Sequence, residues 1–121
     1  MKLSLLKALY TDTLTKVYSL SEAQNIFYIV LQWLEKKSKT DVIVGNETLL
    51  SETYMDILAE LQKGVPVQYL TNEAPFYNLD YYVDERVLIP RPETEQLVHL
   101  ILQEHPKYTG SVLDIGTGSG C

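Results

Sequence analysis

The chain of 121 residues is poor in cysteine, in basic side chains and in long uncharged apolar runs. Its one cysteine, Cys121, excludes an internal disulfide, and residues 1–7 are interrupted by charge too soon for a signal-peptide core or a membrane span. Ten Lys and Arg against sixteen Asp and Glu give a net charge of -6. This balance argues against a protein that holds nucleic acid by spreading basic side chains over phosphates. We expect a cytoplasmic protein.

Proline is absent before Pro66, and over residues 1–64 the apolar residues recur with helical spacing. A hydrophobic content of 45% with 21% charged residues is typical of a soluble globular protein. The length is sufficient for one small domain with its own core. The pattern therefore predicts that the first half of the chain is a helical bundle.

Three helices are predicted in this half. The first carries the apolar stripe Leu6, Leu9, Tyr10, Leu14 and Val17. Ser19 stands three residues before Glu22, a capping-box spacing that opens a second helix, which we expect at the centre of the bundle. Its stripe is Ala23, Ile26, Phe27, Val30, Leu31 and Leu34. The last carries Tyr54, Ile57, Leu58 and Leu61, with Ser51 as its N-cap and Gly64 as its left-handed end. Residues 40–46 fit a helical turn or a short extended segment equally well.

After Pro66 the apolar period changes from helical spacing to alternation. Residues 76–83 alternate as a strand, residues 84–86 suit a turn, and residues 87–89 can return antiparallel, which predicts a hairpin. Pro92 suits the first position of a following helix, and Pro106 ends it. We expect Leu97, Leu100 and Ile101 to line the buried side of this helix.

The end of the chain combines an apolar strand with alternating glycines. Val112, Leu113 and Ile115 suit a buried parallel strand, and residues 116–120, Gly-Thr-Gly-Ser-Gly, suit a tight turn that delivers backbone N–H groups to a ligand. An ordinary strand-to-helix loop and a dinucleotide site are the alternatives, although the dinucleotide fingerprint wants glycine or alanine where Cys121 stands. Such a turn opens a doubly wound α/β domain, which needs further strands and helices. We therefore expect the amino-terminal part of a longer enzyme.

Several of these segments together resemble a known family. They are residues 64–71, Phe76-Tyr77, the run Ile-Pro-Arg-Pro-Glu-Thr-Glu at residues 89–95, and Leu-Asp-Ile-Gly-Thr-Gly-Ser-Gly at residues 113–120. In order and spacing they resemble the bacterial release factor glutamine methyltransferases, the HemK or PrmC family. Asn72 and Asn78 stand where glycines are expected, and asparagine tolerates a positive φ better than most residues.

The resemblance implies an α+β fold for these residues. Residues 1–70 would be a helical substrate-recognition domain, residues 71–90 a β-hairpin linker, and residues 91–121 the start of a class I, Rossmann-like α/β methyltransferase domain. The cofactor would be S-adenosyl-L-methionine. The partner would be a peptide-chain release factor, methylated on the side-chain nitrogen of its Gly-Gly-Gln glutamine. Neither a membrane, direct nucleic-acid binding nor a metal is implied.

Site residues follow from the same resemblance. The cofactor would be contacted by Gly116, Thr117, Gly118, Ser119 and Gly120, with Asp114 positioning the turn or making a water-mediated contact. Arg91, Thr94 and Glu95 are candidates for lining the mouth of the active site. His99 and His105 are expected on a helix surface and at its end, with no metal-ligand spacing.

The Asn-Pro-Pro-Tyr segment that holds the substrate amide in this family does not occur in the 121 residues. We therefore expect the chain by itself to be inactive and to carry recognition. Two alternatives stay open, a non-catalytic helical module that binds a protein and a methyltransferase acting on nucleic-acid adenine. A strand at residues 112–115 without neighbours would expose an edge through which the chain self-associates.

Overall fold

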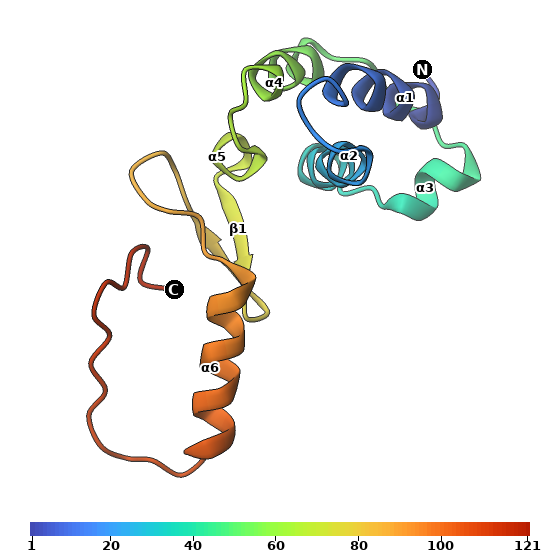
Figure 1. The fold of residues 1–121 in the computed structure, drawn as a ribbon. Helices are drawn as coiled ribbons and strands as arrows, with labels where there is room; N and C mark the ends of the chain where they lie inside the picture. Colours follow the sequence, from blue (N-terminus) through green and yellow to red (C-terminus); the bar gives the residue numbers. More distant parts are fainter. The chain divides into compact units, whose positions relative to one another are not determined.

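The computed structural model describes all 121 residues and divides into two compact units, Met1–Thr71 and Asn72–Cys121 (Figure 1). The first unit contains five helices: α1 (Leu3–Leu14), α2 (Leu20–Glu35), α3 (Lys39–Val44), α4 (Glu52–Gln62) and α5 (Val67–Thr71). The second contains the strands β1 (Glu73–Phe76) and β2 (Leu79–Tyr82) and the helix α6 (Pro92–Glu104). The predicted α+β class and the helical first half are confirmed.

The hydrophobic core lies in the first unit and is built around α1. This helix packs against α2, α3 and α4, whereas α2 packs against α1 and α5, so the expectation that α2 is the central helix was wrong. The buried side of α1 consists of Leu3, Leu6, Tyr10 and Leu14. Leu9 and Val17 were wrongly assigned to this side and are exposed, because Leu9 lies off the stripe and Val17 follows the end of the helix.

The predicted start of α2 is confirmed in atomic detail. The Ser19 backbone N–H donates to the Glu22 carboxylate at 3.0 Å, and the Glu22 backbone N–H donates to the Ser19 hydroxyl at 3.3 Å. These two bonds satisfy donors that an α-helix leaves unpaired in its first turn. The hydrogen bonds from Ser19 also lower the pKa of the exposed Glu22 carboxyl. The predicted stripe of α2 is buried, with Leu34 half-buried at its edge.

The segment that the sequence left undecided is helical. Ser38 precedes α3, and its backbone N–H and hydroxyl donate to the Asp41 carboxylate at 2.8 and 2.9 Å. All four apolar residues predicted for α4 are buried. Ser51 precedes α4 as expected, but its side chain accepts no capping bond. Gly64 has a φ of +87°, which confirms the predicted left-handed end.

The hairpin occurs earlier in the chain than predicted. β1 pairs antiparallel with β2, with Phe76 opposite Leu79, so the turn is the dipeptide Tyr77-Asn78 inside the segment that was predicted to be one strand. Residues 87–89 form no strand, and that part of the prediction was wrong. The period-two spacing of residues 76–83 does not change at the turn, so the pattern gives no sign that the chain reverses there. Both turn residues have a positive φ, 47° and 62°, as a two-residue type I′ turn requires.

Asn72 continues the hairpin beyond the paired strands. Its φ is +55°, its side-chain amide donates to the Val83 carbonyl at 3.0 Å, and its own carbonyl accepts from the Val83 N–H at 3.3 Å. The expectation that Asn72 and Asn78 adopt a positive φ in place of glycine is confirmed.

The helix predicted after Pro92 is confirmed as α6, with Pro92 at its start and His105 at its end. Its expected buried side is exposed: Leu97, Leu100 and Ile101 are 56%, 49% and 46% accessible. The predicted strand over residues 112–115 is also absent, and its apolar side chains are exposed. One physical reason explains both errors. A parallel strand needs neighbouring strands for its hydrogen bonds, a helix of this kind buries its stripe on such a sheet, and β1 and β2 form the one sheet of the chain.

Candidate functional site

The glycine turn at residues 116–120 places open backbone at the surface. Gly116, Gly118 and Gly120 have φ values of +80°, +60° and +80°, a region that other residues enter only at a cost. A Cβ added at any of the three would meet nothing within 4 Å. The Gly120 N–H donates to the Thr117 carbonyl at 3.1 Å, which closes a tight turn. The conformation therefore requires glycine, and the space beside the backbone is open.

The polar residues around this turn have no fixed partners in the chain. Asp114 and Thr117 are exposed and Ser119 is half-buried, and none of their side chains makes a hydrogen bond. The role predicted for Asp114, to position the turn or a water-mediated contact, stays a prediction. Cys121 is a free, partly buried cysteine.

The amino end of α6 carries the three residues predicted for the substrate side. Arg91 is the N-cap residue, its side chain makes no capping bond, and both Arg91 and Thr94 are exposed. Glu95 differs from them because its carboxylate accepts the Tyr77 backbone N–H at 2.8 Å. The structure thus leaves two of the three side chains open and ties the third to the hairpin turn.

A hollow of about 320 Å³ lies where the hairpin turn meets α6, lined by Tyr77, Asn78, Glu95, Gln96 and His99. The Tyr77 hydroxyl and His99 Nδ1 are 3.0 Å apart, and their ring centroids are 6.3 Å apart. The sequence prediction placed His99 on a helix surface and missed this contact. Its spacing of four residues from Glu95, which puts both on one side of a helix, was the available signal.

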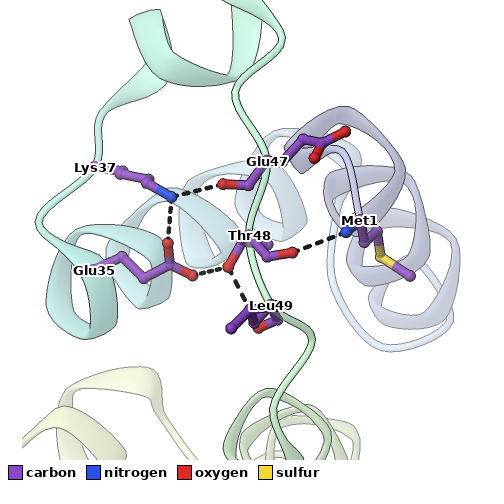
Figure 2. A pocket seen from close by; sticks show the side chains of 6 residues that line it. All are labelled: Met1, Glu35, Lys37, Glu47, Thr48 and Leu49. Carbon is purple, nitrogen blue, oxygen red and sulfur yellow. Dashed lines mark hydrogen bonds and ion pairs between the residues drawn. The ribbon is translucent and has the colours of Figure 1, made fainter.

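A second pocket, of about 450 Å³, lies in the helical unit and is shown in Figure 2. It is lined by Met1, Glu35, Lys37, Glu47, Thr48 and Leu49. The Met1 ammonium donates to the Thr48 carbonyl at 2.8 Å, and the Lys37 ammonium donates to the Glu47 carbonyl at 2.8 Å. The first bond holds the start of the chain, and the second holds the residues just after α2, against the segment that leads into α4.

The Glu35 carboxylate contacts two other residues that line this pocket, Lys37 and Thr48 (Figure 2). It accepts from the Thr48 hydroxyl, from the Tyr54 hydroxyl at 2.6 Å, and pairs with the Lys37 ammonium at 2.6 Å. Burial opposes ionisation, but the hydrogen bonds from these three donors outweigh it and lower the pKa of Glu35 below its usual range. Burial together with the neighbouring Glu35 raises the pKa of Tyr54. Since the charged groups are already paired with one another, this cluster is structural.

The chain has no grouping of three or more His, Cys, Asp or Glu side chains placed to hold a metal ion. None of its six helices combines the length and the apolar character needed to cross a bilayer.

Comparison with known proteins gives one consistent family name. No family model matches the chain. A protein of Flavobacterium psychrophilum is 34% identical over 120 residues, covering 93% of this chain and 42% of that protein. A protein of Clostridium acetobutylicum is 37% identical over 121 residues, covering 90% and 42%. A protein of Streptococcus pneumoniae is 58% identical over 65 residues, covering 54% and 23%. Each carries the name release factor glutamine methyltransferase. The chain therefore spans about two fifths of the length of the Flavobacterium psychrophilum and Clostridium acetobutylicum proteins.

Proposed function

Because the chain is a homologue of the release factor glutamine methyltransferases, we propose that it forms the amino-terminal part of such an enzyme. The enzyme would transfer a methyl group from S-adenosyl-L-methionine to the glutamine side-chain nitrogen in the Gly-Gly-Gln loop of peptide-chain release factors. The observation that carries this proposal is the identity of 34–37% over at least 90% of the chain with proteins of that name. The helical unit would recognise the release factor.

The glycine turn has the properties that a cofactor site of this kind needs. Bound S-adenosyl-L-methionine supplies a methyl group on a sulfonium centre. Gly116, Gly118 and Gly120 would let backbone N–H groups approach the carboxylate and ribose of the cofactor, because no Cβ stands in the way. The hydroxyls of Thr117 and Ser119 add hydrogen-bonding groups at the same turn. The three positive φ values support this assignment, since they are the reason that the turn needs glycine.

The substrate side requires orientation more than acid–base chemistry. A glutamine amide nitrogen is a poor nucleophile because its lone pair is delocalised into the carbonyl, so the enzyme gains most by aligning it with the methyl group. Arg91 and Thr94 have exposed side chains at the amino end of α6 and are our candidates for contacts with the substrate. The residues that hold the amide would lie outside these 121 residues, which contain no Asn-Pro-Pro-Tyr segment.

The test is transfer of labelled methyl from S-adenosyl-L-methionine to a purified release factor. The full-length protein that contains this chain should label the factor, and the 121-residue chain alone should not. Labelling should disappear when the glutamine of the Gly-Gly-Gln loop is replaced. A Gly118→Val variant should lose transfer, because valine strongly disfavours a φ of +60°. Absence of transfer by a folded full-length protein would contradict the proposal, and labelling of adenine in nucleic acid would replace it with the other methyltransferase reading.

A further inference from the structure

The hairpin turn next to α6 is held in a costly conformation. Tyr77 has a φ of +47°, in the left-handed region that a bulky L-residue rarely adopts. Such a residue persists when its surroundings determine its conformation, and strained residues of this kind gather at functional positions. The contacts that keep Tyr77 in this conformation are therefore candidates for a functional role.

Two side chains of α6 hold Tyr77 from opposite ends. The ladder pairs Phe76 with Leu79, which leaves the Tyr77 backbone N–H outside the β1–β2 hydrogen bonds. The Glu95 carboxylate accepts that N–H at 2.8 Å. One helical turn later, His99 Nδ1 lies 3.0 Å from the Tyr77 hydroxyl. The backbone and the ring of one residue are thus both tied to one side of α6.

We propose that Glu95 is a positioning residue, whose carboxylate fixes the hairpin turn to α6 and does not contact the substrate. Hydrogen bonds to an ionised carboxylate are stronger than those between neutral groups, so this bond is suited to hold a strained turn. Arg91 and Thr94 lie within one turn of Glu95 on the same helix and have exposed side chains. We call the hydrogen bond between the Glu95 carboxylate and the Tyr77 backbone N–H the clamp. The clamp would keep Arg91 and Thr94 in a fixed place beside the hairpin. This functional consequence rests on the function proposed above, whereas the clamp itself does not.

The clamp is tested on the 121-residue chain by NMR measurement of amide hydrogen exchange. A Glu95→Ala variant should speed exchange of the Tyr77 amide by roughly tenfold, because the protecting acceptor is gone. A Glu95→Gln variant should stay within about twofold of the wild type, because its amide oxygen still accepts the bond. Glu93→Ala is the matched control. It removes a carboxylate from the same helical turn, and the Glu93 carboxylate is exposed and has no bonded partner. Unchanged Tyr77 exchange in Glu95→Ala would overturn the proposal.

The role of Glu95 in the reaction is tested in the full-length protein with the same three variants. Glu95→Ala should lower kcat/KM for the release factor by roughly tenfold and leave the KM for S-adenosyl-L-methionine unchanged. Glu95→Gln should retain activity within about twofold. Equal losses in the Ala and Gln variants would show that the charge itself meets the substrate, and would overturn the positioning role. An inactive wild-type protein with a protected Tyr77 amide would contradict the proposed function while supporting the clamp.

Discussion

Glu35 joins more segments of the helical unit than any other charged side chain. It is the last residue of α2, and its partners are Lys37 just after the helix, Thr48 in the loop that follows α3, and Tyr54 in α4. Tyr10 of α1 extends the contacts, because its buried hydroxyl donates to the Tyr54 carbonyl at 2.5 Å. A half-buried carboxylate with three donors is a stable arrangement, and removal of its charge leaves those donors less well satisfied.

Replacement of Glu35 by Gln should therefore have an effect that depends on pH. The folded-state pKa of Glu35 lies below its ordinary value of 4.5, so the carboxylate contributes stability above about pH 4.5 and loses that contribution as the pH falls through the folded-state pKa. We expect Glu35→Gln to lower the free energy of unfolding by about 1 kcal/mol at pH 7 and by less at pH 3, where part of the contribution of the carboxylate is lost. Urea unfolding at the two pH values measures this.

Glu47→Gln is the matched control at the residue scale, because the Glu47 side chain is exposed and makes no hydrogen bond. Its effect should stay within about 0.5 kcal/mol at both pH values. A loss for Glu35→Gln that is the same at both pH values would show that shape, and not charge, is what Glu35 contributes.

At the scale of an element, the starts of α2 and α4 show how much of a helix cap the neighbouring residues determine. Ser19 and Ser51 occupy equivalent positions before α2 and α4, and both were predicted as N-caps from sequence. Of the two, only the Ser19 hydroxyl accepts a capping bond, from the Glu22 backbone N–H. The Glu22 carboxylate, three residues later, accepts the Ser19 backbone N–H and completes the box. Residue 54, at the same distance from Ser51, is Tyr54, which cannot complete a capping box and whose hydroxyl is bonded to Glu35.

The two serines should therefore respond differently to alanine. Ser19→Ala should lower the free energy of unfolding by about 1 kcal/mol, the usual loss for a bonded N-cap. Ser51→Ala should lower it by about half of that or less, because no side-chain bond is lost. Thermal unfolding followed by circular dichroism would compare them, and equal losses would contradict the assignment of a capping bond to Ser19 and not to Ser51.

The hairpin is the element in which local pattern misled the prediction. Tyr77, Leu79, Tyr81 and Val83 stand at every second position of residues 76–83, a spacing that predicts one strand. The chain reverses inside that run, since Tyr77 and Asn78 both take a positive φ. Asparagine was an indication of a turn, and its tolerance of this conformation was predicted; tyrosine gave none. The Glu95 contact from α6 is what holds Tyr77 there, and no local rule includes it.

At the scale of the whole molecule, stability and the proposed chemistry lie in different units. Every member of the hydrophobic core cluster lies between Leu3 and Val67, in the first unit. The second unit carries the glycine turn and α6, and α6 has no buried residue. Exposed apolar side chains on α6 and in residues 112–115 give this chain surfaces through which it can self-associate, which we keep as a proposal.

A shortened chain that ends at Thr71 should therefore fold by itself. We expect it to keep its helical circular dichroism and one cooperative urea transition, because no core residue is removed. A chain that ends at Gly64 is the comparison, since it lacks α5 and the buried Val67 that pack on α2. It should be less stable by about 1.5–3 kcal/mol. Loss of cooperative unfolding in the longer of the two would show that the helical unit depends on residues 72–121.

The sequence by itself determined the features that depend on neighbouring residues. These are the spacing of the helical stripes, the box at Ser19, the left-handed Gly64, the asparagines in place of glycine, and the segments at residues 64–71, 76–77, 89–95 and 113–120 that together resemble the family. Tertiary structure decided which helix is central, where the hairpin reverses, and how Glu35 and Glu95 are used. The physical reason is the separation along the chain between the residues that interact. A cap or a stripe is fixed within a few residues, whereas the partners of these carboxylates lie up to 19 residues away and meet them only when the chain has folded.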